Sequence, residues 1–309
     1  MRLYRTGLSG RSLARLQEGG SGGSGGRIWD PNPPFRSDLV PEKRLSSLQL
    51  RIISALVLAP IAIVALVLGG SYFILFLGLA AAAMCFEWCR TSISAHVPLF
   101  TVITGLTVLS SLYMAFIGEL VLTVAILFGG SVILLVLSSF LKQKTDRIWA
   151  FFGPLVAGVP ILSLAVLRGL PDIGFAVTTS LFLVIWATDI GAYFSGKTIG
   201  GPKIAPVISP NKTWAGLIGG MIAAMLVAFC AAYFLINNMN APFGILLLGA
   251  VGAILAQAGD FTESAWKRKF GIKDASNLIP GHGGVLDRLD GILFVAPALL
   301  GLILITERT

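Results

Sequence analysis

The sequence predicts an all-α, polytopic membrane protein with about nine transmembrane helices. Its 309 residues are 55% hydrophobic and 12% charged, with a mean hydropathy of +0.85, which is far above the range of a soluble globular domain. Apolar runs of about 17–23 residues recur along the chain, and about 20 residues let a helix cross a ~30 Å hydrocarbon core. Short segments of alternating hydrophobicity, which are typical of transmembrane β-barrels, do not occur in the sequence.

The apolar runs carry few charges inside. Because hydrocarbon offers no water to bond, each run is expected to form a helix that pairs its own N–H and C=O groups. The predicted spans are 49–69, 71–89, 97–117, 119–141, 148–168, 173–195, 214–236, 243–265 and 290–306. Cys85, Cys89 and Cys230 fall inside these spans without a second pair or a suitable His to complete a metal site, so we expect them to be packing residues.

The basic residues lie almost entirely on one side of the spans. With a cytosolic N-terminus, 21 of the 23 Lys and Arg residues fall on one side, in the N-terminal segment, at Arg51 near the start of the first span and in four loops, and only Arg168 and Arg308 fall opposite. Cytosolic loops carry an excess of Lys and Arg. We therefore expect a multi-pass protein of the cell inner (plasma) membrane with a cytoplasmic N-terminus. The net charge of +8 then follows from topology and needs no nucleic-acid partner.

Residues 1–48 differ from the rest of the chain. Residues 1–17 carry four arginines and no acid, and GGSGGSGG at 19–26 is typical of a flexible linker. An Arg-rich start is also found in organellar targeting segments. We expect a disordered basic segment on the cytosolic side and place the transmembrane domain at 49–309.

An acid falls near the end of the sixth predicted span. Asp189, Tyr193 and Lys197 are spaced four residues apart, so they share one helix face. An unpaired carboxylate in hydrocarbon is costly, and intramembrane acids often mark functional sites. The alternative is that the span ends near Ala187 and leaves Asp189 in the interface.

The loop at 196–216 is rich in glycine and proline and is not expected to be a continuous helix. It carries Lys203 and Lys212 and ends in SPNKTW, where Ser209, Asn211 or Thr213 could cap the next helix. A helix N-terminus beside lysines is a ready anion site, although basic cytosolic loops are common in membrane proteins.

The end of the eighth predicted span is polar on one stripe. Asp260 and Ser264 are four residues apart, and Lys267 and Arg268 follow on the next turn. Oxygen ligands of this kind suit Mg²⁺, which shares its coordination with substrate phosphates. The alternative is a helix end with i,i+4 charge pairs, which explains Glu263 and Lys267 better than it explains Asp260.

The loop that follows contains PGHGG and then DRLD at the start of the last span. Glycine-rich backbone can approach an anion closely, and Asp287 could face Asp260 to complete a metal site. Neither GxxxxGK[ST] nor GxGxxG after a strand is present, so no soluble nucleotide-binding fold is expected. The residues indicate phosphate chemistry at the cytosolic membrane surface.

Together these residues resemble the signature of the phosphatidate cytidylyltransferases, also called CDP-diacylglycerol synthases. The similar run starts at Ser264 and continues through KR, KD, PGHGG and DRLD with the spacing of that family. TDIGAYFSGK and ISPNKTWAG are also similar to segments of the family, so the resemblance is strong over 186–291. The earlier helices match only in being apolar. The resemblance implies that 49–309 is a transmembrane catalytic domain.

The resemblance implies transfer of a cytidylyl group from CTP to phosphatidic acid, which gives CDP-diacylglycerol and pyrophosphate in phospholipid biosynthesis. A phosphomonoester has a second pKa of about 6, so the lipid phosphate is largely ionised and the site must supply cations and positioning. By resemblance the metal is Mg²⁺, alone or with a second cation. Its predicted ligands are Asp260, Ser264 and Asp287.

The resemblance also implies roles for other polar residues. The predicted catalytic residues are Asp260, Asp287, Lys267, Arg268 and His282. The predicted substrate-binding residues are Asp189, Tyr193, Lys197, Lys212, Ser264, Lys273, Gly283, Gly284 and Arg288. His282 would either donate to a phosphate or only order its turn, and both roles stay open. Asp274 and Asp290 are expected to pair with neighbouring Lys or Arg.

The expected partners are CTP, phosphatidic acid and membrane lipid, and a homodimer is one option. Since one substrate arrives from each phase, we expect a polar cavity that opens to the cytosol and sideways to lipid. A secondary transporter would instead place charges at the bilayer midplane within an internal repeat, and no repeat is found. A lipid kinase, or a phosphotransferase that uses CDP-lipids, would share metal and membrane, but the DG…AR…G…D pattern of the latter is missing from the sequence.

Overall fold

The computed structural model describes residues 47–141, 147–236 and 242–306. Eight of its helices are long and apolar enough to cross a membrane. They are α1 (Ser47–Leu68), α2 (Gly70–Ser92), α3 (Val97–Phe116), α4 (Leu120–Phe140), α5 (Arg147–Gly169), α6 (Gly174–Thr198), α7 (Trp214–Ala231, continued by the π-helix η1, Ala232–Ile236) and α8 (Pro242–Lys269). The predicted all-α, multi-pass fold is confirmed. Residues 1–46 of the predicted basic segment lie outside the described residues.

The ninth predicted span is shorter than a membrane-crossing helix. α10 (Ile292–Thr306) has 15 residues, about 22 Å at 1.5 Å per residue. The chain before it forms the short helix α9 (Leu286–Leu289), followed by Asp290 and Gly291. The carboxylate and the glycine delay the start of the apolar helix by two residues. The described residues therefore do not confirm the count of nine.

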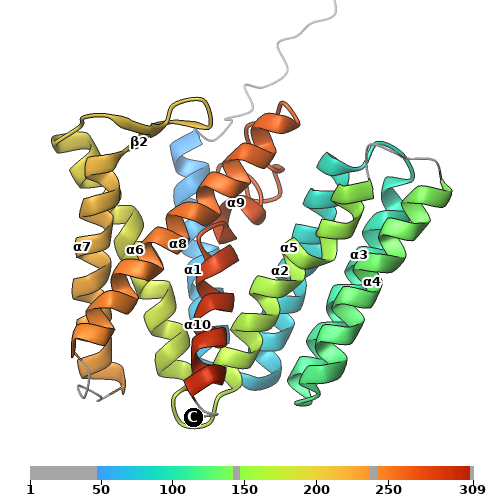
Figure 1. Ribbon diagram of the computed structural model, residues 1–309, viewed down its shortest axis with the longest axis horizontal. Helices are drawn as coiled ribbons and strands as arrows, with labels where there is room; N and C mark the ends of the chain where they lie inside the picture. The colour runs from blue at the N-terminus through green and yellow to red at the C-terminus, as the bar shows by residue number, and fades with distance from the viewer. Residues whose placement is uncertain (1–46, 142–146, 237–241, 307–309) are drawn as a thin grey trace, which may run out of the picture. The chain divides into compact units, whose positions relative to one another are not determined.

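α8 is longer than predicted. Its 28 residues extend about 42 Å, close to the ~40–45 Å of a bilayer with its headgroups. The helix continues for a turn beyond the predicted end at residue 265, and this turn carries Lys267, Arg268 and Lys269. α6 likewise continues past Asp189 to Thr198. Both helices thus end on the same side of the described bundle (Figure 1), and their last turns carry polar side chains there.

The membrane helices form two groups. α6, α7 and α8 pack together, α2, α3, α4 and α5 pack together, and α10 packs against both α5 and α8 (Figure 1). Small residues allow α6 and α7 to approach closely, since a Cβ at Gly191 would lie 2.8 Å from the carbonyl oxygen of Gly219. Such approach at glycines is typical of membrane helix pairs. It places the polar face of α6 beside the start of α7.

A β-hairpin joins α6 to α7. It pairs β1 (Lys203–Ala205) with β2 (Ser209–Thr213) in antiparallel register, with Lys203 opposite Thr213. β2 leads directly into α7, and Thr213 Oγ1 accepts a hydrogen bond from the backbone N–H of Gly216 at 3.0 Å. Of the three caps considered from the sequence, Thr213 is the one that forms.

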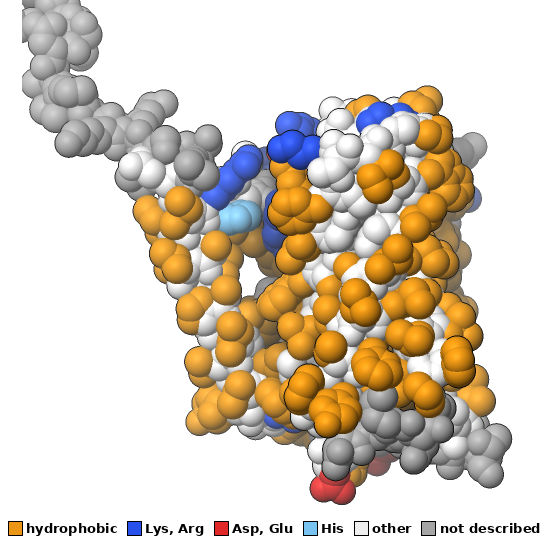
Figure 2. Space-filling model, turned by 90° about the vertical axis from the view of Figure 1, so that its left-hand side faces the viewer, with side chains coloured by type: hydrophobic (Ala, Val, Ile, Leu, Met, Phe, Trp, Pro, Cys, Tyr) orange, Lys and Arg blue, Asp and Glu red, His pale blue; other side chains and the backbone are white. Residues whose placement is uncertain are grey.

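The outer surface of the described helices is apolar. Hydrophobic side chains cover the face drawn in Figure 2, and Lys and Arg side chains gather at one end of it. A bilayer would solvate such a surface without the cost that water imposes. Inside, Cys85 and Cys89 are buried as predicted for packing residues, whereas Cys230 is exposed.

Candidate functional site

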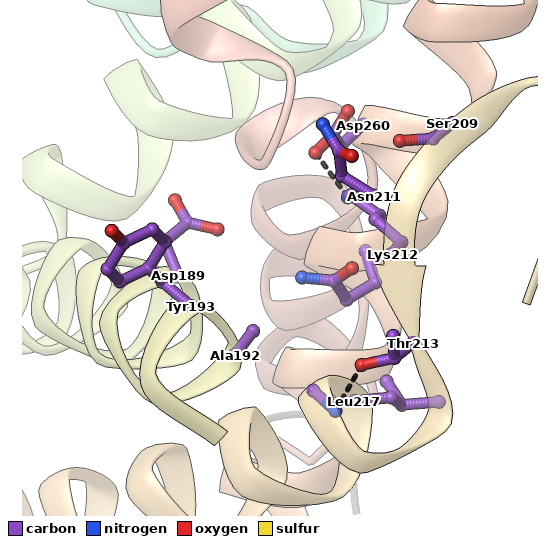
Figure 3. Close-up of a pocket in the computed structure, with 11 residues that line it drawn as sticks. Asp189, Ala192, Tyr193, Ser209, Asn211, Lys212, Thr213, Leu217 and Asp260 are labelled. Atoms are coloured by element: carbon purple, nitrogen blue, oxygen red, sulfur yellow. Dashed lines mark hydrogen bonds and ion pairs between the residues drawn. The ribbon is translucent and has the colours of Figure 1, made fainter. Parts of the chain in front are cut away.

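A polar pocket of about 230 Å³ lies between α6, the hairpin, α7 and α8. Asp189 and Tyr193 line it from α6, and Asp260 lines it from α8 (Figure 3). Asn211 and Lys212 enter from β2 on the opposite side. Carboxylate, ammonium, amide and hydroxyl groups therefore meet in one space at the polar end of the bundle. The pocket brings together four predicted site residues from three separate segments: Asp189, Tyr193, Lys212 and Asp260.

Asp260 links the hairpin to α8. It forms an ion pair with Lys212 and accepts a hydrogen bond from Ser264 Oγ at 3.2 Å. The ammonium of Lys212 also lies 4.8 Å from the centre of the Phe261 ring, an arrangement that favours a cation. Lys212 thus joins β2 to α8 through its ion pair with Asp260, and both residues line the pocket.

Three carboxylates gather at the base of the site. Among the described residues, Asp260, Glu263 and Asp290 each offer an oxygen, and these oxygens lie within 4.8 Å of one another. Gly259 makes this possible because a Cβ there would collide with the carbonyl oxygen of Asp290. Glu263 is buried, and apart from its ion pair with Lys267 its two oxygens have no hydrogen-bond partner among the described residues.

This cluster fits a divalent cation. Like charges held so close repel one another, and Mg²⁺ and Ca²⁺ prefer carboxylate oxygens. The predicted ligand Asp260 belongs to the cluster and Ser264 adjoins it. Glu263 and Asp290, which sequence reasoning assigned to ordinary charge pairs, supply the other carboxylates.

Asp287 lies in a neighbouring network rather than in that group of three. Its carboxylate accepts hydrogen bonds from Lys267 Nζ at 2.7 Å and from the backbone N–H groups of Ala275 at 2.9 Å and Gly284 at 2.7 Å. Burial raises the pKa of Asp287, but the hydrogen bonds from Lys267 and Gly284 and the charge of Lys267 outweigh it and hold the pKa below its ordinary value. Lys267 also pairs with Glu263 at 2.5 Å, so it connects the two acidic groups.

Glu87 of α2 holds the glycine-rich loop, and sequence reasoning missed it. Its carboxylate is fully buried and accepts hydrogen bonds from Ser276 Oγ at 2.5 Å and from the backbone N–H groups of Val285 and Leu286, both at 2.8 Å. A Cβ at Gly284 would lie 2.6 Å from this carboxylate. The sequence did contain an indication of this role, because Glu87 is an acid inside a predicted span and such acids often mark functional sites.

α1 contacts the same loop through His282. Ser54 Oγ lies 2.7 Å from His282 Nδ1, and Arg51 Nε donates to the carbonyl of Gly281 at 2.9 Å. Arg288 Nη2 donates to the carbonyl of His282 at 2.5 Å. Burial, followed by the charges of Arg288 and Arg51, lowers the pKa of His282. The ring is therefore neutral near pH 7, with Nδ1 directed at a hydroxyl.

Other predicted residues lie around the rim. Lys197 Nζ lies 3.4 Å from the hydroxyl of Tyr193, and Arg268 Nη1 donates to the carbonyl of Ile272 at 3.3 Å. Lys273 is exposed in the loop after α8. Gly283 has a φ of 89°, a value that favours glycine. The roles assigned to these residues stay predictions.

Comparison with known proteins decides the family. The cytidylyltransferase family model matches residues 49–306. This chain belongs to the cytidylyltransferase family. The phosphatidate cytidylyltransferase of Brucella suis biovar 1 (strain 1330) is 40% identical over 264 residues, which cover 82% of this chain and 93% of that protein.

A second relative supports the same family assignment. The phosphatidate cytidylyltransferase of Haemophilus influenzae (strain ATCC 51907 / DSM 11121 / KW20 / Rd) is 35% identical over 281 residues, 81% of this chain and 96% of that protein. The family resemblance drawn from residues 186–291 is confirmed, and the similarity extends through the apolar helices before them. This cytidylyltransferase is thus a membrane member of its family, with polar and carboxylate groups collected at one end of its helices.

Proposed function

We propose that this cytidylyltransferase transfers a cytidylyl group from CTP to phosphatidic acid, giving CDP-diacylglycerol and pyrophosphate for phospholipid synthesis. The names of its relatives support this substrate pair. The observation that carries the proposal is the polar pocket beside the three carboxylates at the ends of α6 and α8. A water-soluble triphosphate and a membrane lipid can both reach that position.

The reaction joins two anions. An oxygen of the lipid phosphate attacks the α-phosphorus of CTP, a P–O bond forms, and the bond to the β-phosphate oxygen breaks to release pyrophosphate. The attacking oxygen is already largely ionised, so no strong base is required. The protein must lower the repulsion and align the two phosphates. Lys212 and Lys267, which are both half-buried, form ion pairs with Asp260 and Glu263 of the cluster.

A divalent cation, Mg²⁺ in our proposal, would be held by Asp260, Glu263 and Asp290. When bound it would neutralise phosphate charge. The assignment of Ser264 and Asp287 as ligands and the presence of a second cation stay predictions. Ser264 fixes one oxygen of Asp260, and Asp287 fixes Lys267. The chain's own residues thereby set the orientation of the cluster before substrate arrives.

The CTP phosphates are proposed to bind in the polar pocket. Lys212 supplies a cation there, Asn211 an amide and Tyr193 a hydroxyl. The N-terminus of α7 adjoins them, and the N–H groups of a first helical turn favour anions. Arg268, Lys273, Arg288 and His282 are proposed to contact phosphates from the glycine-rich loop. His282 is neutral, so it would bind a phosphate as an N–H donor.

We further propose that the protein lies in the cell inner (plasma) membrane with this site on the cytoplasmic side. The support is the placement of 21 of 23 basic residues on one side of the predicted spans. Residues 1–48 would form a basic cytoplasmic segment before the catalytic domain. A homodimer is compatible with the exposed apolar side of α1, and no nucleic-acid partner is proposed.

A pair of labelled substrates tests the proposed reaction. Membranes that contain the full chain are incubated with phosphatidic acid and with CTP labelled either in the α- or in the γ-phosphate. Cytidylyl transfer moves only the α-label into the chloroform phase. A γ-label in the lipid would indicate a kinase and would contradict the proposal. Membranes without the chain supply the background.

A further inference from the structure

A second cavity lies between α5 and α8, and it is apolar. Its volume is about 350 Å³. α5 contributes Trp149, Phe152 and Val156 to one wall, and α8 contributes Ala265 and Trp266 to the other. Trp88, Leu286 and Leu293 also line it. We call this cavity the α5–α8 groove.

The groove ends at the carboxylate cluster. Glu263 lines the groove, whereas Asp260, three residues earlier on the same helix, lines the polar pocket. Since the oxygens of these two residues lie within 4.8 Å of each other, the two cavities meet at the cluster from different sides. A ligand in the groove can therefore present one end to a ligand in the polar pocket.

The groove has an apolar side entrance and a basic end. Phe152 is 43% exposed, and it lies on a helix that can cross a membrane, so the entrance faces hydrocarbon rather than water. At the polar end Lys269 also lines the groove, with its ammonium 5.0 Å from the centre of the Trp149 ring. Lys267, two residues before Lys269, lies within the acidic network. An occupant must be apolar along most of its length and anionic at one end.

A nucleotide does not fit this description. Its base and ribose carry hydrogen-bonding groups, and burying such groups without partners is costly. The groove walls named above offer almost none. A lipid chain, by contrast, moves from bilayer to groove with little change in its apolar contacts, so the anionic headgroup decides which lipid stays.

We infer that the α5–α8 groove binds an acyl chain of the phosphatidic acid substrate, with the lipid phosphate at the Lys269 end beside Glu263. The inference rests on the proposed function for the identity of the lipid. It assigns each substrate a separate entrance: CTP enters the polar pocket between α6 and the hairpin, and the lipid enters sideways between α5 and α8.

Photo-crosslinking tests this inference without turnover. The full chain carries benzoylphenylalanine at Phe152, or at the exposed position Ile148 of α5 as a matched control, and is reconstituted in phosphatidylcholine with labelled phosphatidic acid. We expect capture at Phe152 that unlabelled phosphatidic acid abolishes and extra phosphatidylcholine does not. Capture at Ile148 should respond to both lipids alike. Equal competition by both lipids at Phe152, or no capture there, would overturn the inference.

A steric variant gives an independent measurement. Val156→Trp fills the groove, so it should raise the KM for phosphatidic acid about tenfold or more and leave the KM for CTP unchanged. Ile148→Trp should change neither constant. An unchanged KM for phosphatidic acid in Val156→Trp overturns the groove assignment while the proposed function stands. If the unaltered chain forms no CDP-diacylglycerol, the proposed function fails, and the crosslinking competition still decides whether the groove selects an anionic lipid.

Discussion

Replacing Glu87 with Ala should release the glycine-rich loop from α2. The carboxylate of Glu87 is 0% exposed and accepts three hydrogen bonds from the loop, one from Ser276 and two from backbone N–H groups. The loop carries His282 and leads into Asp287. Loss of its anchor should therefore reduce activity although Glu87 itself does not line either cavity.

The size of the effect follows from those contacts. A hydrogen bond to a charged group contributes ~1.5–3 kcal/mol, and a buried group left without a partner costs ~1–3 kcal/mol. Glu87→Ala leaves the N–H groups of Val285 and Leu286 without their acceptor. Water that enters as the loop opens offsets part of this cost. A net loss of ~3–4 kcal/mol lowers the population of the ordered loop by about 10²–10³.

The assay is the initial rate of cytidylyl transfer, measured with the thermal unfolding midpoint of the purified protein. Glu87→Gln keeps one acceptor oxygen but turns an NH₂ group toward a backbone N–H, so its rate should lie between those of Ala and the unaltered chain. Glu119→Gln, which changes an exposed acid at the start of α4, serves as the control and should have no effect. A normal rate and midpoint in Glu87→Ala would refute the reasoning.

Substitutions at four further residues test the rest of the site. Asp260→Asn and Asp290→Asn keep the shape of the side chain but remove its charge. The rate should fall by orders of magnitude, and the Mg²⁺ concentration for half-maximal rate should rise. Near-normal turnover at ordinary Mg²⁺ would show that the substituted residue does not belong to the cation site. Gly259→Ala should separate Asp260 from Asp290 and abolish activity, because the added Cβ would meet the carbonyl of Asp290. Gly301→Ala is the control, since its Cβ meets no atom within 4 Å, and it should leave the rate unchanged in the same assay. Arg268→Lys should weaken activity, since Lys cannot bind phosphate bidentately. Arg268→Ala should weaken it severely, and both variants should keep a normal membrane yield. If the rate of Arg268→Ala depends on CTP concentration as in the wild type, this residue is a membrane anchor only.

Most of the fold could be predicted because hydrocarbon imposes one local rule on the chain. Each apolar run had to become a helix, and eight of them did so at the expected places. The prediction was less accurate where polar residues interrupt a run. Asp290 and Gly291 shorten α10, and the polar residues after Asp260 lengthen α8. Hydropathy alone does not report how far a helix continues into the headgroup region.

The site could be predicted only in part. Some of its residues are charges that stand out beside apolar spans, whereas others belong to the site through contacts between distant segments. Asp189, Lys212 and Asp260 stood out as charges beside apolar spans, and they meet in one pocket. Glu263 was interpreted as an i,i+4 partner of Lys267, which it is, but its place among the three carboxylates depends on Asp290 from another segment. Contacts between distant segments leave no trace in local spacing, and Glu87, 198 residues before Val285, is the clearest case.

The most direct test of the central claim is the nucleotide dependence of the purified full-length protein. The protein is mixed with phosphatidic acid, Mg²⁺ and one of CTP, ATP, GTP or UTP, and both pyrophosphate and the lipid product are quantified, with Asp260→Asn as the inactive control. The account predicts CDP-diacylglycerol and pyrophosphate in equal amounts from CTP, with far slower reaction of the other three nucleotides. Equal rates with ATP, or a lipid product that gains phosphate without cytidine, would contradict it.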